Sequence, residues 1–151
     1  MKMPGYKVHI GGSIVAGLLV LLMLVNVGWY IIEPQQLTVL IVLSILGALF
    51  PDIDTDSKGK RIYYSGMLIL SLTLIYFKEF QWAAYLGVLA MLPGVSAHRG
   101  WTHTWWAMLL VPMPMLLLPY YVYGQPFPTL LPYYVAFVTG YFSHLLLDKE
   151  F

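Results

Sequence analysis

Apolar residues occur along this chain in long blocks, such as residues 14–25 and 37–50, separated by short polar turns. They do not recur at the spacing of a helix with one face in water, so lipid is the expected surrounding. Glu, Pro, Gly and Lys signals divide the pattern into six predicted helices, at residues 10–32, 35–50, 62–77, 81–97, 103–123 and 129–147. The pattern predicts an all-α, polytopic membrane protein with about five to six transmembrane helices in a single domain, residues 1–151.

The predicted helices differ in length and regularity. The second and third would be only about 24 Å long, short of the roughly 30 Å hydrocarbon core, so we expect thin spans or a re-entrant hairpin. Pro112, Pro114 and Pro119 remove backbone donors within the fifth, which predicts a kinked or broken helix. The first follows Lys2 and Lys7, as a signal peptide would, but no small-residue cleavage site follows and we expect it to be retained.

Composition agrees with a membrane protein and narrows its chemistry. Hydrophobic residues make up 60% of the chain and charged residues 10%, against about a quarter charged in soluble proteins. The formal net charge of +1 provides no field that attracts nucleic acid, which argues against nucleic acid as a partner. Membrane lipids are the expected partners because of the long apolar blocks. Because the chain has no cysteine, any bound metal must take nitrogen or oxygen ligands.

Basic residues are distributed unequally between the two faces of the predicted bundle. Six spans place the N-terminus, the 51–61 and 98–102 loops and the C-terminus on one face, and the turns near residues 33, 78 and 125 on the other. The first face carries Lys2, Lys7, Lys58, Lys60, Arg61, Arg99 and Lys149, and the second carries only Lys78. The positive-inside rule therefore predicts a multi-pass inner (plasma) membrane protein with its N-terminus and first face in the cytoplasm.

The histidines and most carboxylates share this predicted cytoplasmic face. It carries His9, Asp52, Asp54, Asp56, His98, His103, His144 and Asp148. His144 and Asp148 lie at the end of an apolar helix, where ionisable groups are costly unless they pair, face a cavity or bind an ion. Their four-residue spacing puts both on one helix face, where they can chelate one ion or the acid can orient the imidazole.

Two loop motifs add further candidate ligands. The alternating acids of residues 51–56 repel one another unless a cation lies between them, although a solvated acidic turn is the alternative. Residues 98–103 place two imidazoles around Arg99, whose guanidinium can bind a phosphate in a bidentate manner. Here the alternative is a membrane anchor flanked by interfacial hydrogen bonders. His9 precedes Gly11 and Gly12, which could serve only close helix packing.

Together these groups form a mixed nitrogen and oxygen ligand set. Such a set favours a divalent zinc ion, with manganese or iron as alternatives. A metal ion with an open position can activate water for attack on a phosphoryl or acyl centre. No G-x-S-x-G nucleophile motif competes with this chemistry.

The motifs, in their order along the chain, resemble those of a known family. They are His9 with Gly11 and Gly12, PDID at 51–54, HRGWTH at 98–103 and SHLLLD at 143–148. The family is that of membrane-bound metal-dependent hydrolases typified by the LexA-regulated inner membrane protein of enteric bacteria. The resemblance implies a metal and catalytic set of His9, Asp52, Asp54, His98, His103, His144 and Asp148. Members usually continue past the last Asp with a further motif and an apolar stretch, whereas this sequence stops at Phe151, as either a short member or a cut chain.

The leading hypothesis is a metal-dependent hydrolase at the cytoplasmic bilayer surface, acting on a phosphoester or lipid-linked substrate. Within the set, Asp52, Asp54, His103 and Asp148 are the expected catalytic residues, and Arg99 is expected to bind the anionic group of the substrate. A divalent-metal transporter or sensor is one alternative, although polar groups near the span centres are few, among them Ser44, Ser71 and Thr73. A non-catalytic membrane scaffold is the other.

Overall fold

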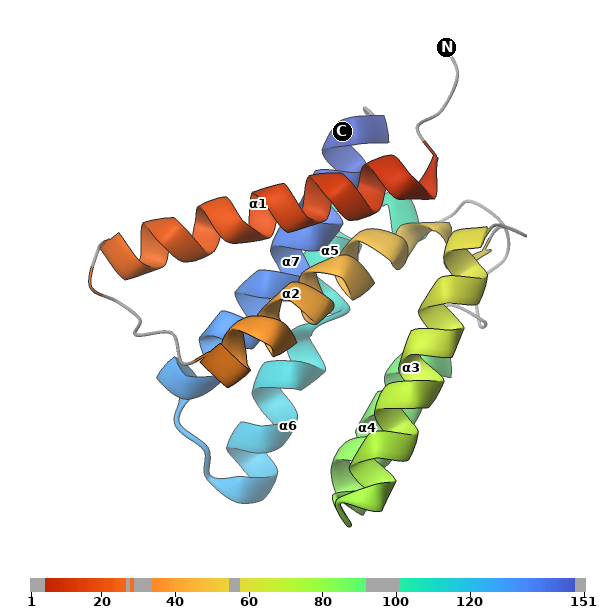
Figure 1. Ribbon diagram of the computed structural model, residues 1–151. Helices are drawn as coiled ribbons and strands as arrows, with labels where there is room; N and C mark the ends of the chain where they lie inside the picture. The colour runs from red at the N-terminus through yellow and green to blue at the C-terminus, as the bar shows by residue number, and fades with distance from the viewer. Residues whose placement is uncertain (1–4, 27, 29–33, 55–57, 92–100, 149–151) are drawn as a thin grey trace.

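The chain folds entirely into helices over the part described by the computed structural model, residues 5–26, 28, 34–54, 58–91 and 101–148 (Figure 1). The helices are α1 (Tyr6–Asn26), α2 (Pro34–Leu49), α3 (Lys58–Tyr76), α4 (Phe80–Met91), α5 (Trp105–Leu110), α6 (Met113–Tyr123) and α7 (Phe127–Asp148). Two short 3-10 turns, η1 (Pro51–Asp54) and η3 (Trp101–His103), follow α2 and precede α5. No strand occurs in these ranges, which confirms the predicted all-α class.

The predicted break in the fifth helix falls at Pro112. There α5 gives way to α6, whose first turn contains Pro114, where a missing backbone donor costs little. Pro119 lies inside α6 and does not end it. The helix ends instead at Gly124, whose φ of 64° lets its backbone N–H reach back to the carbonyl oxygen of Tyr120.

Three segments are long and apolar enough to cross a membrane: α1, the combined stretch Trp105–Tyr123, and α7. The apolar parts of α2 and α4 are shorter than a span requires, and α3 begins with Lys58, Lys60 and Arg61, which shortens its apolar length. The expected count of five to six transmembrane helices is therefore not confirmed.

Small residues let α1, α2 and α7 approach one another closely. A Cβ added to Gly140 would overlap the backbone carbonyl of Ser44, and one added to Gly47 would overlap that of Phe137. The Ser44 hydroxyl donates a hydrogen bond of 3.0 Å to the backbone oxygen of Ser13 on α1. Backbone approach at small residues is a common way to pack helices in membranes, where no hydrophobic effect drives them together.

An aromatic layer fills the core on the C-terminal side of α2. Its members, Phe50, Tyr63, Phe137 and Tyr141, are fully buried. Phe50 packs against the other three with ring centroids 5.7–6.1 Å apart. The C-terminal end of α2, the start of α3, the start of α5 and the last turn of α7 lie toward one end of the bundle in Figure 1, and the α3–α4 and α6–α7 turns lie at the opposite end.

Replacing Gly140 with alanine should destabilise the protein, because the new methyl group meets backbone that cannot rotate away. Overpacking of this kind costs about 1–3 kcal/mol. Thermal unfolding in detergent measures the effect. Gly87→Ala is the matched control, since no atom lies within 4 Å of its added Cβ. Equal stability of the two variants would contradict the close α2–α7 contact.

Candidate metal centre

Four ionisable side chains from three separate segments converge at one end of the bundle. Asp52 comes from η1, His103 ends η3, and His144 and Asp148 lie in the last two turns of α7. One potential ligand atom of each residue lies within 4.8 Å of those of the other three. We call these four residues the candidate metal centre.

The spacing of the donor atoms fits a single small cation. His144 Nε2 lies 3.2 Å from Asp148 Oδ2 and 3.8 Å from Asp52 Oδ1, and His103 Nε2 lies 3.9 Å from the same Asp52 oxygen. In a tetrahedron with metal–ligand bonds near 2.1 Å, the donors would be about 3.4 Å apart. These three distances bracket this value and the other donor pairs lie within 4.8 Å, so side-chain movements that bring the donors together would complete such a site.

Burial increases from one side of the candidate metal centre to the other. The exposed fraction of the side chain is 24% for Asp52, 13% for His103, 7% for Asp148 and 0% for His144. A closed structural site would bury all four ligands, whereas a catalytic site keeps a position open to water or substrate. The arrangement is therefore closed on the α7 side and accessible on the side of Asp52.

Several buried polar atoms of the centre lack hydrogen bonds. Both ring nitrogens of His144 and Oδ1 of Asp148 are buried without one, although the backbone of Ala48 lies near the His144 ring and Nε2 of His9 lies 3.4 Å from Oδ1. Buried polar atoms in folded proteins almost always have a partner, and unpaired ones are costly. A cation coordinated by these side chains would satisfy them, so the residues present fit a divalent metal ion.

His9 lies beside the four-residue group rather than within it. Its ring stacks on that of His144 with centroids 4.0 Å apart, and its Nε2 lies 3.4 Å from Oδ1 of Asp148. The two oxygens of Asp148 therefore face two imidazoles, those of His9 and His144. In this position His9 can orient the carboxylate, as residues outside the ligand shell do in many metal sites.

The α2–α7 contact sets the register that brings the acids and imidazoles together. Ser44 meets Gly140, the backbone of Ala48 contacts His144 one turn later, and Asp52 then reaches the same imidazole. From the first contact to the second, both helices advance four residues, which keeps the contacting positions on one helix face. The close approach at Gly140 therefore positions Asp52 beside the end of α7.

Tyr141 ties η3 to α7 and was not among the predicted site residues. Its hydroxyl donates a hydrogen bond to the backbone oxygen of Thr102, and the Thr102 hydroxyl lies 3.3 Å from Nδ1 of His103. The next hydroxyl, that of Thr104, caps the first turn of α5. Tyr141 precedes His144 by three residues, so helix periodicity could have placed it on the same face.

The structure describes no side chain for the remaining predicted site residues. The structure describes the backbone of Asp54 at the end of η1 but not its side chain. Asp56, His98 and Arg99 lie outside the described residues, so their roles remain predictions.

Fold and centre together define an all-helical membrane protein with an aspartate–histidine cluster at one end of its bundle. The chain matches the YdjM inner membrane protein family across residues 3–149 and belongs to that family. This match confirms the family resemblance seen in the motifs. No curated protein and no solved structure matches the chain.

Asp148→Asn should weaken zinc binding by more than about 100-fold, because it removes the negative charge while keeping the shape. Loss of an outer-shell residue costs only 10–100-fold. Competition with a chromophoric chelator measures the affinity of the purified protein for zinc. Glu79→Gln, a change in the turn at the opposite end of the bundle, should leave it unchanged. Equal affinities in both variants would remove Asp148 from the ligand set.

Tyr141→Phe should weaken zinc binding by about 10–100-fold, because His103 loses part of the support for its turn. The same chelator titration applies. Tyr134→Phe is the control, since that hydroxyl also joins α7 to a backbone oxygen, that of Leu109, at 3.0 Å and outside the candidate metal centre. Comparable losses in the two variants would indicate a general effect on packing and not positioning of His103.

Proposed function

We propose that this chain is a membrane-embedded, metal-dependent hydrolase that acts at the cytoplasmic bilayer surface on a phosphoester or lipid-linked substrate. The observation that carries the proposal is the convergence of Asp52, His103, His144 and Asp148 around a point where one cation could contact all four. The exposed side of the cluster supports catalysis over a purely structural role, because a substrate needs access to the ion.

The burial of each residue supports a division of roles. His144 and Asp148, enclosed at the end of α7, hold the ion and the charge balance of the site. Asp52 and His103, on the accessible side, are the ligands that can leave the ion, and the one that leaves can take a proton from attacking water and return it to the leaving group. A bound divalent ion would supply Lewis-acid chemistry, polarising a phosphoryl or acyl group and acidifying water. Asp54 is proposed as a further catalytic acid. Arg99 is proposed to bind the anionic group of the substrate.

The donor set and its spacing support zinc as the metal. Two imidazoles and two carboxylates at distances near those of a tetrahedron suit zinc better than magnesium or calcium, which prefer oxygen ligands in larger number. Manganese and iron also accept such a set.

The position of the centre supports a substrate that reaches it along the membrane. The ligands lie at the end of α7, one of the apolar helices of spanning length, and hence at the expected depth of lipid headgroups. Lys58 and Arg61, both exposed, begin α3 next to η1 and would attract an anionic headgroup. The excess of basic residues at this end favours the cytoplasmic side.

A transporter or sensor is less well supported by the same region. Transport requires ionisable or coordinating groups near the bilayer centre. In the described helices, two of the hydroxyls named above are engaged in helix structure, with Ser44 bonded to the backbone of Ser13 and Thr73 to that of Ile69. A scaffold without catalysis would have no need of bound metal.

Asp52→Asn and His103→Ala should each reduce hydrolysis by about 100 to 10,000-fold, the usual range for loss of a proton-transfer group. Phosphate release from aryl phosphoesters and phospholipid vesicles measures the rate, with the metal content determined on the same samples. Chelation should abolish the activity, and zinc, manganese or iron should restore it. Wild-type rates in either variant, or in the metal-free protein, would refute the proposed reaction.

A further inference from the structure

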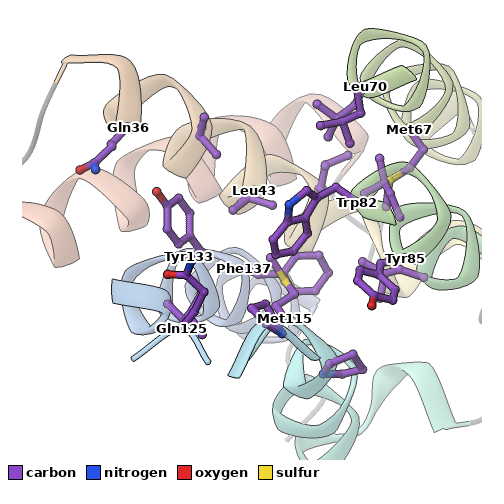
Figure 2. A pocket seen from close by; sticks show the side chains of 18 of the residues that line it. Gln36, Leu43, Met67, Leu70, Trp82, Tyr85, Met115, Gln125, Tyr133 and Phe137 are labelled. Atoms are coloured by element: carbon purple, nitrogen blue, oxygen red, sulfur yellow. The ribbon is translucent and has the colours of Figure 1, made fainter. Parts of the chain in front are cut away.

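A second feature of the bundle is a cavity of about 610 Å³ between α2, α3, α4, α6 and α7. Figure 2 shows side chains from these helices pointing into it. Its volume lies within the range of about 300–1,000 Å³ found for small-molecule pockets. None of the candidate metal ligands lines it.

The cavity exists because α3 and α4 pack closely against each other but only loosely against the other helices. The α3–α4 hairpin also contacts η1 and α2, whereas its packing against α6 and α7 is sparse. At the far end, Trp82 on α4 stacks on Tyr123 on α6 with ring centroids 5.7 Å apart. The helices are thus separated along their length and joined at a few points, which leaves space at the depth of the bilayer.

The lining is apolar along most of its length and polar at one end. Gln36 at the start of α2, Gln125 in the α6–α7 turn and Tyr133 near the start of α7 gather at one side in Figure 2, away from Met67 and Leu70. That side is the end of the bundle opposite the candidate metal centre. No charged side chain occurs in the described lining, so the polar end suits hydrogen-bonding groups such as esters or amides.

The aromatic layer closes the other end. Phe137 lines the cavity and packs on Phe50 and Tyr141, with ring centroids 6.1 and 6.4 Å away. Phe50 lies directly before Pro51 and Asp52 in the chain. The cavity therefore ends beneath the candidate metal centre without reaching it.

The length of the cavity corresponds to one leaflet. Its lining on α2 extends from Gln36 to Leu46, ten residues or about 15 Å of helix. This is half of the roughly 30 Å hydrocarbon core. An apolar channel of that length, polar only at its outer end, matches a hydrocarbon chain that enters from the leaflet opposite the centre.

We infer that this cavity binds one hydrocarbon chain of a membrane lipid from the leaflet opposite the candidate metal centre, with the ester region of the lipid at Gln36, Gln125 and Tyr133. The inference goes beyond the proposed hydrolysis and does not depend on it. A lipid held there would fill the space between the α3–α4 hairpin and the rest of the bundle.

Quenching of Trp82 by a brominated lipid tests the inference. Phosphatidylglycerol with bromine on its acyl chains is titrated into the delipidated full-length protein in detergent, and subtracting the signal of Trp82→Phe isolates the contribution of Trp82. Quenching should saturate. Because Trp82 stacks on Tyr123, two residues before Gln125 of the polar end, bromine close to the ester should quench it more than bromine at the chain end.

Two matched double variants test whether the cavity is the binding site. Leu70→Phe with Met115→Phe fills it from α3 and α6 and should weaken the saturable quenching at least about tenfold, the equivalent of about 1.4 kcal/mol. Leu68→Phe with Leu117→Phe places the same groups on exposed positions of the same helices and should have no effect.

The inference would be overturned by no saturable quenching, by equal effects of the two double variants, or by stronger quenching from bromine at the chain end. The last result would mean that the chain enters from the side of the metal centre, as that of a lipid substrate would. Crosslinking that places a second copy of the protein over the cavity would also overturn the inference, because that copy and not a lipid chain would then cover it. Metal content and phosphate release are measured on the same samples, so the cavity and the hydrolase proposal can fail separately.

Discussion

The backbone contact between α2 and α7 is the constraint on which the rest of the arrangement depends. With no side chain at Gly47 or Gly140, the two helices touch through their main chains. This contact fixes the register that continues into η1 and carries Asp52 to His144. A larger residue at Gly140 would separate the helices, and the carboxylate and imidazole would separate with them. The α2–α7 contact therefore determines both the packing of the helices and the geometry of the candidate metal centre.

The same contact encloses groups that apolar surroundings disfavour. His144 is fully buried, Asp148 nearly so, and His9 stacks against the first of them. Unpaired polar atoms at such a position destabilise a membrane helix unless a partner satisfies them. A cation coordinated by all four donors would satisfy these buried groups and offset the cost of their burial. The side of the candidate metal centre at Asp52 stays accessible to water or substrate. Stability and function then depend on the same ion.

Sequence patterns predicted the parts that rest on local periodicity. The all-α class follows from the apolar blocks, and the break at Pro112 follows from the missing backbone donor of proline. The position of His144 and Asp148 on one helix face follows from their four-residue spacing. The stacking of His9 on His144 and the bond from Tyr141 to η3 depend on how distant segments pack, which spacing does not encode. The count of five to six spans is not confirmed for a related reason, since apolar composition does not fix where a helix ends.

An anomalous-scattering map of the protein crystallised with zinc tests the metal centre most directly. The predicted result is one anomalous peak within about 2.0–2.2 Å of donor atoms from Asp52, His103, His144 and Asp148. A well-folded, zinc-replete protein with no peak among these side chains would contradict the assignment.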